Sequence, residues 1–597
     1  MMSNDDKILS LLRTYFEPDD YFLVYKRMIG TGCIGGKACG MLLARKIIQT
    51  DNPGAFARME PHDSYYLGSD VFYTYIVHNK FWRLHIHQKT KQGYFKLAPE
   101  LERAFLQGSF PEAIRLQFIR MLEYFGQRPI IVRSSSLQED AFGNAFAGKY
   151  ESVFCINTGT MDERLNELEN AVRTVYASTM NPSALEYRRQ RGLGFKDEQM
   201  ALLIQRVSGS MYEDFLMPNA AGVGYSYSAY KWDNSINASD GMLRLVMGLG
   251  TRAVDRTEGD YPRIVNLSAP DRSTLTASWA KHQYSQRYVD LMDYTTKSLS
   301  SRPLMAVTPH MDNWYKKLVL EHDYDAERTF RERGQHREIL FASCEGLVRN
   351  KEFTDCMKSL LHTLQNAYQY PVDIEFTING NDDGEFVFNL LQCRPLQVGT
   401  RRDAVVVPSL PDEKTVFSVT DASMGGSRAE DIDYVILIDA KAYYEFPYKR
   451  KPDIAHIIGD INQHFRKSKK NLLLFAPGRI GTSSPELGVP VSFAQINHFC
   501  AICEMSDSEA GYMPELSYGS HMFQDLVEAE IFYTALFDNQ KTRLFHKDIF
   551  HDMSNILTEI LPDCKDYEDI VKVYHTGDMH LKLYSDIQNE KTILGFE

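Results

Sequence analysis

The chain has 597 residues, of which 44% are hydrophobic, 12% aromatic and 24% charged. This composition is ordinary for a globular protein and excludes a disordered or collagen-like chain. At roughly 150 residues per domain, the length predicts about two to four domains. The 66 Lys and Arg residues against 79 Asp and Glu residues give a formal charge of -13. Because no basic excess marks a polyanion-binding surface, we expect neither nucleic acid nor a membrane as a partner.

Nine cysteines, an odd number, are scattered through apolar segments, which favours a reducing compartment over a disulfide framework. Cys500 and Cys503 form a CxxC pair, but no second pair completes a zinc site, so FCAICEM is better interpreted as a buried strand. The first residues lack the apolar core of a signal peptide, and no apolar run approaches the roughly 20 residues of a membrane span. We therefore expect a cytoplasmic protein, and the sequence leaves homo-oligomer formation open.

Helices and strands are both expected along the first part of the chain. Its start predicts a short amphipathic helix with Ile8 and Leu12 on the apolar face, followed by a strand YFLVY (21–25). A glycine-rich turn then leads into a helix over about 38–48, whereas residues 51–95 allow no assignment. Further helices are expected over 99–107, 111–125, within 161–191 and over 351–369, and strands over 129–133, 200–207, 221–227 and 243–247.

A domain boundary follows a predicted β-hairpin. The strands VDIEFTI and EFVFNLLQ flank the turn NGNDDG (379–384). Residues 398–416 then combine charges, two prolines and little periodicity. We therefore predict a domain over 1–400, a linker over 401–416 and a smaller domain over 417–597.

The pattern of mixed elements resumes after the linker. Strands are expected over 433–438, 471–475 and about 498–504, and helices over about 521–534 and 551–560. Strands and helices therefore alternate or mix throughout the chain. The predicted class is α/β or α+β.

The hairpin is the first place where chemistry is indicated. Asp373 and Glu375 are two apart on one strand and share a face, and Gln392 and Arg394 share a face on the other, alternating with Leu391 and Cys393. Carboxylate and amide oxygens are hard ligands suited to Mg²⁺, and an adjacent arginine can brace phosphate oxygens. On spacing alone, a solvated strand face with a salt bridge is the favoured alternative.

Weaker signals for anion binding lie earlier in the chain. Arg133 ends a strand and precedes three serines, where a phosphate-contacting group or an ordinary surface arginine would both fit. Lys37 stands in a glycine-rich turn that enters a helix, although the pattern is not a Walker P-loop. The small residues of FGNAFAGKYES (142–152) suggest a lid over phosphates with Lys149 assisting, or only a turn.

Taken in this order, the motifs resemble the nucleotide-binding module of the pyruvate phosphate dikinase and phosphoenolpyruvate synthase family. The stretches that carry the resemblance are GGKACG (35–40), VRSSSLQEDAFGNAFAGKYESV (132–153), IQRV (204–207), AGVGYS (221–226), GLG (248–250), DIEF (373–376) and LLQCRP (390–395). The combination of these motifs in one chain is specific.

The resemblance implies an ATP-grasp-like fold for roughly residues 15–400, with ATP and Mg²⁺ as cofactors. It implies that Lys37 and Arg133 contact the nucleotide phosphates and that Gln205 lies on the strand lining the adenine pocket. It further implies that a second group of residues holds metal and phosphates. That group is Asp373, Glu375, Gln392 and Arg394, of which Asp373, Glu375 and Gln392 are the metal ligands.

The sequence departs from the family pattern in two respects. The family usually has glutamate after GLG, where this chain has Thr251, so any role of that acid is lost or moved to Asp255. No GGxxxHxA-type phosphohistidine motif and no pyruvate-binding barrel are found, and about 190 residues after the linker are too few for both. We therefore do not expect the complete pyruvate-phosphorylating reaction in one chain.

The C-terminal segment looks like a domain appended to some relatives of this family, and the resemblance implies no activity for it. Its loop PGRIGTSS contains Arg479 and several hydroxyls, which could hold an anion. His521 stands where a helix is expected to begin, so a phosphohistidine there is chemically sensible. A capping histidine packed between domains is the favoured alternative.

These observations predict an ATP- and Mg²⁺-dependent phosphotransferase. Arg133 and Arg394 are the expected catalytic residues, with His521 as a speculative phosphoryl acceptor. The other acceptors considered are a histidine of a partner protein and a small molecule. The alternatives are a nucleotide-binding regulatory protein without catalysis and the ATP-binding subunit of a split dikinase.

Overall fold

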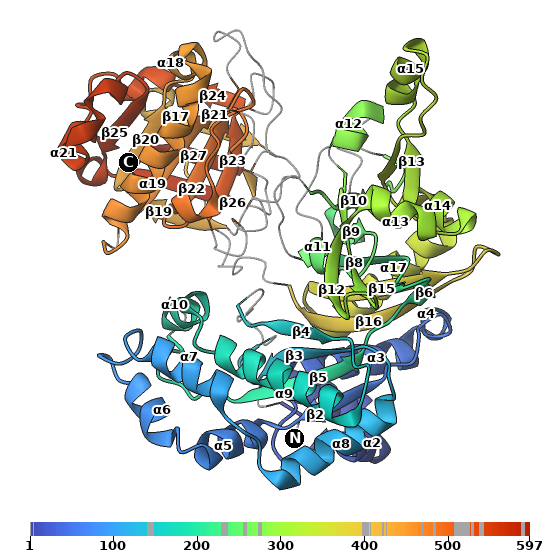
Figure 1. Cartoon of the computed structure of the whole chain (residues 1–597). Helices are drawn as coiled ribbons and strands as arrows, with labels where there is room; N and C mark the ends of the chain where they lie inside the picture. The colour runs from blue at the N-terminus through green and yellow to red at the C-terminus, as the bar shows by residue number, and fades with distance from the viewer. Residues whose placement is uncertain are drawn as a thin grey trace. The chain divides into compact units, whose positions relative to one another are not determined.

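The structure is a computed structural model of the chain. It describes residues 2–3, 5–139, 149–190, 192–227, 237–254, 260–272, 278–283, 285–396, 405, 407–420, 423–424, 427–468, 470–480, 485–506, 526, 531–536, 542–586 and 591–597. The chain forms two compact units, Met1–Leu396 (unit 1) and Gln397–Glu597 (unit 2). Helices and strands are mixed in both units (Figure 1).

Unit 1 contains a mixed sheet, sheet A, whose strands β1 (Met28–Ile29), β2 (Ser64–Leu67), β5 (Met200–Arg206), β3 (Ile130–Ser136) and β4 (Ser152–Cys155) lie in that order. Val132 and Ile204 alternate with Arg133 and Gln205 along the central strands, so they face opposite sides. Val132 and Ile204 pack with helices α5 (Ser69–His78), α7 (Ala98–Gln107), α8 (Glu112–Phe125) and α9 (Met161–Ser178). Arg133 and Gln205 are left on the other face.

Helix α3 (Gly36–Asp51) lies against sheet A and against β16 (Phe386–Pro395) (Figure 1). The packing with β16 requires glycine, because a Cβ at Gly40 would lie 2.3 Å from the Cys393 carbonyl oxygen. Gly35 precedes the helix with φ of +82°, a conformation that glycine adopts at little cost. The glycine-rich turn therefore sets both the start of α3 and its distance from the hairpin.

The second sheet of unit 1, sheet B, is antiparallel and contains the predicted hairpin. Its strands β10 (Arg263–Asn266), β9 (Met242–Val246), β8 (Ala220–Tyr225), β15 (Val372–Gly380) and β16 lie in that order. The amphipathic helix α17 (Lys351–Tyr368) buries Leu360 and Leu364 in the core that Ile374 and Phe376 of β15 share. Asp373 and Glu375 alternate with these apolar side chains and so face away from α17.

A third sheet of unit 1 contains β12 (Ser298–Pro303), β11 (Tyr288–Asp293), β7 (Phe215–Met217) and β6 (Ser210–Tyr212). Further elements of unit 1 are α1 (Asp6–Tyr15), α2 (Pro18–Lys26), α4 (Pro53–Phe56), α6 (Trp82–Gln88), α10 (Pro182–Gln190), α11 (Thr251–Val254), α12 (Ser278–Gln283), α13 (Leu304–Val307), β13 (Leu320–His322), α14 (Asn313–Val319), α15 (Tyr324–Glu332), β14 (Leu340–Ala342) and α16 (Glu345–Arg349).

The predicted strand YFLVY is wrong, since these residues belong to helix α2. Pro18 occupies the first turn, and Glu17 and Asp20 form a reciprocal capping box, so the local start signals favour a helix. Phe22 and Leu23 remain more than 60% exposed, so burial of their side chains in a sheet does not decide the outcome. The segment 51–95, left unassigned above, contains α4, β2, α5 and α6.

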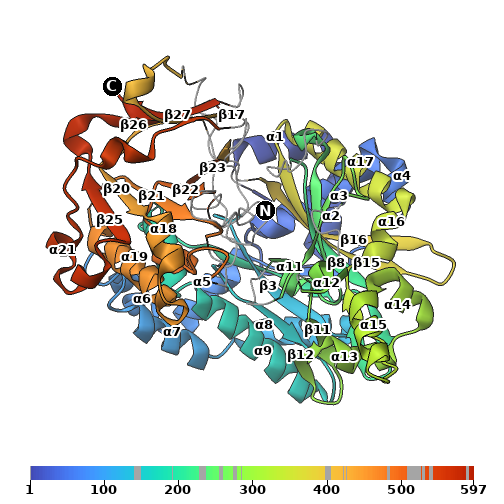
Figure 2. The ribbon, with the colours of Figure 1, turned by 90° about the horizontal axis from the view of Figure 1, so that it is seen from above.

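Unit 2 is built of two sheets and a helical layer, as Figure 2 shows for the strands and helices labelled there. The antiparallel sheet has β19 (Arg428–Asp431), β26 (Leu581–Asp586), β27 (Lys591–Phe596), β17 (Thr415–Thr420) and β24 (Thr542–Phe545) in that order. The mixed sheet has β18 (Ser423–Met424), β23 (Phe532–Leu536), β22 (Ala501–Met505), β21 (Leu472–Pro477), β20 (Tyr434–Ile438) and β25 (Val571–His575), of which β20 to β23 run parallel.

The core of unit 2 lies between its two sheets. Leu473 and Phe475 of β21 share it with Phe417 and Leu583 of the antiparallel sheet. The alternate residues of β21 are buried on the opposite face, on which Figure 2 shows helices α18 (Ala440–Glu445) and α19 (Lys451–Phe465).

Two C-terminal helix predictions require correction. Of the helix expected over 551–560, residues Leu557–Ile560 (α21) are helical. The helix expected over 521–534 lies mostly outside the described residues, and its end is wrong, because Phe532 begins β23. His521, the speculative phosphoryl acceptor, also lies outside the described residues.

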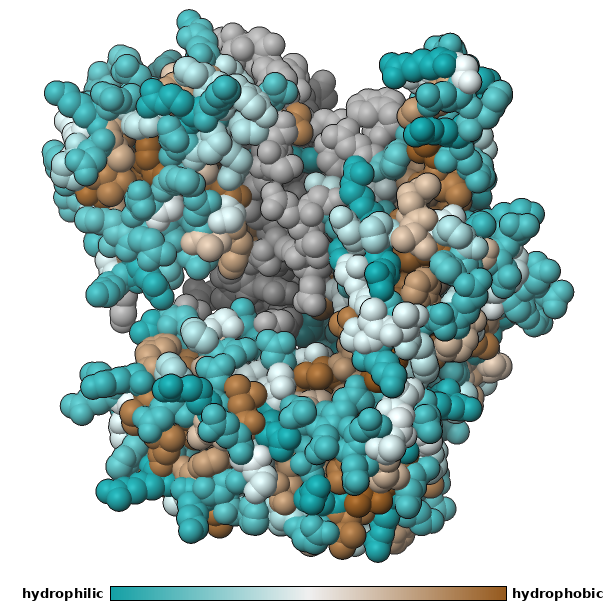
Figure 3. Space-filling model, viewed as in Figure 1, coloured by the Kyte–Doolittle hydropathy of each residue, from teal (hydrophilic) through white to brown (hydrophobic). Residues whose placement is uncertain are grey.

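Hydrophilic side chains predominate on the face of the molecule seen in Figure 3, and hydrophobic ones are scattered among them. Among the residues that the structure describes, no helix combines the length and the apolar character that crossing a membrane requires.

The close contact between α3 and β16 generates a stability prediction. Gly40→Ala should lower the midpoint of thermal unfolding, because an added Cβ would overlap the Cys393 carbonyl oxygen, and overpacking of a core costs about 1–3 kcal/mol. This cost exceeds the roughly 1 kcal/mol by which alanine favours a helix over glycine. Scanning calorimetry measures the effect.

Gly54→Ala is the matched control, because a Cβ at Gly54 in α4 meets its nearest neighbour, Asn52 Oδ1, at 3.9 Å. We expect this variant to be as stable as the wild type or more so. Equal unfolding temperatures for the two variants would contradict the described packing of α3.

Candidate functional site

A cavity of about 550 Å³ lies within unit 1, between sheet A and sheet B. A volume of this size is typical of pockets that bind small-molecule ligands. Its lining joins two kinds of side chain. The polar part includes Lys37, Arg133, Gln205, Glu375, Thr377, Gln392 and Arg394, and the apolar part includes Ile131, Phe154, Val207, Leu249 and Leu391. The cavity therefore offers charge at one set of positions and apolar contact at another.

The register of the hairpin pairs its polar residues directly. Asp373 lies opposite Arg394, and Glu375 lies opposite Gln392. Arg394 Nε donates to Asp373 Oδ1 at 2.8 Å and to Oδ2 at 3.0 Å. Sequence spacing predicted that each pair of residues shares a face, and the backbone pairing brings both pairs to the same place.

A β-bulge in the hairpin sets which side chains reach the cavity. Glu375 pairs with Gln392, but Phe376 pairs with Leu390, so Leu391 is the extra residue. The bulge lets Leu390 stay in the core while Leu391 and Gln392 both line the cavity. The prediction that Leu391 faces away from Gln392 is therefore wrong, because strict alternation does not continue through a bulge.

Arg133 connects the two sheets. Its Nη2 donates from β3 to the Glu375 carboxylate and, at 2.9 Å, to Gln392 Oε1. The side chain of Arg133 is 10% exposed and that of Glu375 is 22% exposed. Burial raises the pKa of Glu375, but the guanidinium groups of Arg133 and Arg394 outweigh it and hold the pKa below its ordinary value. Glu375 is therefore a carboxylate at neutral pH.

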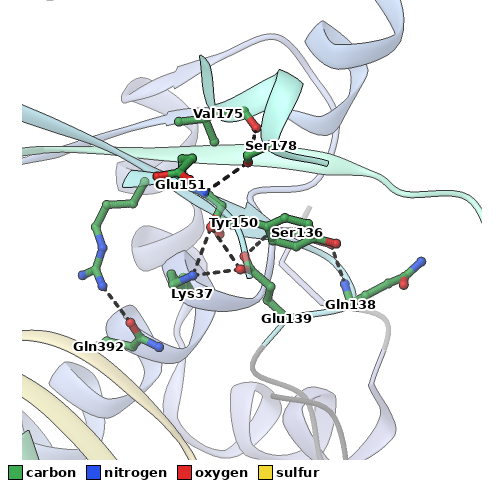
Figure 4. Close-up of polar contacts among 12 residues, drawn as sticks. Lys37, Ser136, Gln138, Glu139, Tyr150, Glu151, Val175, Ser178 and Gln392 are labelled. Atoms are coloured by element: carbon green, nitrogen blue, oxygen red, sulfur yellow. Dashed lines mark hydrogen bonds and ion pairs between the residues drawn. The ribbon is translucent and has the colours of Figure 1, made fainter. Parts of the chain in front are cut away.

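Lys37 approaches the cavity from the first turn of α3. Its Nζ donates to Glu139 Oε1 at 2.9 Å and to Ser134 Oγ at 3.1 Å. Figure 4 shows the side chains of Lys37 and Glu139 directed toward each other. Sequence reasoning assigned no role to Glu139. The available signal was its place in the stretch 132–153, which carries part of the family resemblance.

Gln205 and Thr377 line the cavity with unsatisfied polar atoms. Gln205 Nε2 donates to Met41 Sδ at 3.1 Å. Gln205 Oε1 and Thr377 Oγ1 are buried and have no hydrogen-bond partner among the described residues. Buried polar atoms normally find a partner, so these two atoms fit a cavity that receives a ligand with hydrogen-bonding groups.

Lys149 is not brought together with these residues. It is not among the described residues that line the cavity, whereas the next residues, Tyr150, Glu151 and Ser152, are. Its Nζ lies 6.0 Å from the centre of the Tyr187 ring. The proposed lid residues 142–148 lie outside the described residues.

Thr251, which stands where the family usually has glutamate, contacts a carboxylate from strand β11. Thr251 Oγ1 donates to Asp290 Oδ2 at 2.5 Å, and both residues line the cavity. Asp290 of β11 therefore places a carboxylate next to Thr251, and this carboxylate also accepts from Arg252 Nε at 3.1 Å. Asp255, the substitute suggested by the sequence, lies outside the described residues.

The donor set on the hairpin fits Mg²⁺ better than a metal held by the protein alone. Among the described residues, no group of three or more His, Cys, Asp or Glu side chains could hold a metal ion. Mg²⁺ is usually bound by one or two carboxylates together with substrate phosphates. Glu375 and the Gln392 amide provide such oxygen atoms in the cavity lining. Asp373, the third predicted ligand, is not among the described residues that line the cavity, and both of its carboxylate oxygens accept from Arg394.

A comparison with protein families identifies the domain that contains this cavity. A family model described as "Pyruvate phosphate dikinase, AMP/ATP-binding domain" matches residues 31–414. This range contains all the residues named above as lining the cavity. The search of curated proteins found no match.

The lowered pKa of Glu375 generates a pH prediction. Because the folded pKa lies below that of the unfolded chain, Glu375 stabilises the folded state above the ordinary glutamate pKa of about 4.3. This stabilisation is lost as the pH falls from there toward the folded pKa. Between pH 6 and pH 3.5, the unfolding temperature of the wild type should therefore fall more steeply than that of Glu375→Gln.

Glu385→Gln serves as the control, because Glu385 is exposed on the hairpin turn. It should keep the pH dependence of the wild type. Parallel curves for the wild type and Glu375→Gln would contradict the ion pairing described for Glu375.

Proposed function

Since the chain belongs to the family of the pyruvate phosphate dikinase AMP/ATP-binding domain, we propose that it is an ATP- and Mg²⁺-dependent phosphotransferase whose nucleotide binds in the cavity of unit 1. The observation that carries this proposal is the convergence of Lys37, Arg133 and Arg394 with the carboxylate of Glu375 in the cavity lining. These residues come from three distant segments of the chain, and a solvated strand face would not gather them in one cavity.

The charge pattern supports a polyphosphate together with a divalent cation as the ligand. Each cation now has a carboxylate partner: Lys37 has Glu139, Arg133 has Glu375, and Arg394 has Asp373. A buried ion that loses its partner is strongly destabilising. A ligand bringing both signs of charge allows arginines and carboxylates to exchange partners without leaving a charge unpaired.

The proposed roles follow from the chemistry of each group. Lys37, Arg133 and Arg394 donate hydrogen bonds to phosphate oxygens, and the arginines can do so with two N–H groups at once. Asp373, Glu375 and Gln392 would hold Mg²⁺, which supplies neutralisation of phosphate charge. Arg133 and Arg394 favour phosphoryl transfer because positioned positive charge stabilises the charge that develops in the transition state.

The apolar part of the cavity supports a base-binding role. Ile131 lies two residues from Arg133 on β3 and therefore on the same face of the strand. It belongs to a hydrophobic cluster with Phe154, Val207 and Leu249. Gln205 Oε1 and Thr377 Oγ1 add hydrogen-bonding capacity to the lining. We propose that this part receives the adenine ring.

The first test is turnover of ATP by the full chain with Mg²⁺. Glu375→Ala should reduce turnover by at least about 100-fold, the scale seen when one electrostatic group of an active site is removed. Chromatography of the products separates AMP from ADP, which distinguishes dikinase-type transfer from a kinase or hydrolase. Omitting Mg²⁺ should abolish turnover in the wild type.

Glu385→Ala is the control for this test, because it removes a carboxylate from the same hairpin at its exposed turn. Turnover by this variant should equal that of the wild type. Equal turnover by Glu375→Ala and the wild type would overturn the assignment. ATP binding without any turnover would indicate a nucleotide-binding regulatory protein instead.

A second test concerns the geometry of Arg133. Its guanidinium contacts both Glu375 and Gln392, and the ammonium of lysine cannot reproduce this planar fork. Arg133→Lys should therefore raise the dissociation constant of Mg·ATP by about tenfold or more although the charge is kept. Isothermal titration calorimetry measures the constant.

Arg349→Lys provides the comparison, since Arg349 is 70% exposed and pairs with Glu345 on the surface. Its dissociation constant should match that of the wild type. If Arg133→Lys binds Mg·ATP as tightly as Arg349→Lys, Arg133 has no role in holding the phosphates.

A further inference from the structure

A buried carboxylate beside the cavity, Glu139, pairs with Lys37 and is assigned no contact with the nucleotide or with Mg²⁺. Glu139 is 1% exposed. One oxygen, Oε1, accepts from Lys37 Nζ at 2.9 Å and from Ser134 Oγ at 3.0 Å, and Oε2 accepts from the Ser136 backbone N–H at 2.8 Å. A buried carboxylate with three donors is held in one orientation.

The contacts of Lys37 leave one direction for a ligand. An ammonium group has three N–H donors. Two of the donors of Lys37 are directed to Glu139 and Ser134, and the described residues provide no hydrogen-bond partner for the third. Lys37 lines the cavity. The remaining N–H is therefore the one available to a group bound there.

We propose that Glu139 is a positioning residue that, together with Ser134, orients the Lys37 ammonium toward a phosphate oxygen of the bound nucleotide. The inference rests on the proposed function, because it takes a polyphosphate as the ligand. A lysine side chain is a flexible four-carbon chain that ends in a point charge. Its direction must therefore come from neighbouring groups.

The support of Glu139 extends to a second buried carboxylate. The Ser136 hydroxyl donates to Glu198, which is 2% exposed. Glu198 Oε2 accepts from the Tyr150 hydroxyl at 2.6 Å and from Arg188 at 3.3 Å. Figure 4 draws part of this network, with a dashed line that joins Lys37 to Glu139.

This network reaches a second wall of the cavity. Tyr150 is followed by Glu151 and Ser152, and all three line it. The Glu151 backbone N–H also donates to Ser178 Oγ at 3.1 Å, as drawn in Figure 4. One connected set of hydrogen bonds therefore holds Lys37 on α3 and the beginning of β4 in fixed positions. Such a set is expected where the direction of a side chain matters.

Positioning and simple charge compensation predict opposite effects of Glu139→Gln. Removing a negative charge near the phosphates should tighten nucleotide binding if Glu139 only compensates Lys37. If Glu139 orients Lys37, binding should weaken despite the more favourable charge. We expect the dissociation constant of Mg·ATP, measured by calorimetry, to rise about tenfold in Glu139→Gln.

A double-mutant cycle with Lys37→Met shows whether the effect passes through Lys37. In the Lys37→Met background, Glu139→Gln should change the dissociation constant by less than about twofold. Additive effects of the two substitutions, or unchanged or tighter binding by Glu139→Gln alone, would overturn the inference. Failure of the wild type to bind Mg·ATP would instead overturn the proposed function.

A measurement without nucleotide tests the positioning directly. The rate at which acetic anhydride modifies Lys37, followed by mass spectrometry, should rise several-fold in Glu139→Gln. Lys46, which pairs with Asp20 at 3.0 Å, is the internal reference and should react at an unchanged rate. An unchanged rate at Lys37 would contradict the role of Glu139.

Ser134→Ala covers the case in which Glu139→Gln folds poorly, because it removes the second support of Lys37 and leaves the carboxylate in place. It should weaken binding of Mg·ATP by about threefold and increase modification of Lys37. Wild-type values in both measurements would count against an orienting role for this pair of contacts.

Discussion

The contact of Arg133 with Glu375 and Gln392 is the interaction on which the site depends. It joins β3 of sheet A to the β15–β16 hairpin of sheet B, so one guanidinium relates two parts of the cavity wall. A buried charge must stay paired or leave a large desolvation penalty uncompensated. Arg133 can therefore change partners but cannot lose them, and the same constraint applies to Glu375. A site of this kind suits a ligand that carries both an anion and a cation.

Two backbone features near this contact, Gly40 and the β-bulge at Leu391, also determine which side chains reach the cavity. Gly40 lets α3 approach β16 to a distance that no Cβ would permit, which brings Lys37 to the hairpin residues. Because Leu391 is an extra residue in β16, Leu390 lies in the core although Gln392, two residues later, lines the cavity. Bulges are common next to active sites for this reason. Apolar packing and polar function are thus satisfied on the same strands.

The two units contribute differently to what is known of the protein. Unit 1 holds the cavity and most of the residues that match the AMP/ATP-binding domain of pyruvate phosphate dikinase. Unit 2 has its own core between two sheets, with parallel strands β20 to β23 in one of them.

Much of unit 1 could be predicted from the sequence because its signals are local. The helical spacing of Leu360 and Leu364 and the alternation of Asp373 and Glu375 with apolar residues each depend on a few neighbouring residues. Local signals also explain the failure at 21–25, where aromatic residues suggested a strand although Pro18 and the capping box start a helix. Shared motifs, rather than spacing, brought Lys37, Arg133 and the hairpin into one hypothesis.

The amino-acid sequence by itself determined the mixed class of elements, the hairpin with its polar face, and the family to which the chain belongs. The tertiary structure alone decided that Glu139 holds Lys37, that Asp290 stands beside Thr251, and that Lys149 points elsewhere. The reason is physical. Periodicity reports which face of an element a side chain occupies, whereas hydrogen-bond partners depend on register, bulges and close packing between segments that lie far apart in the chain.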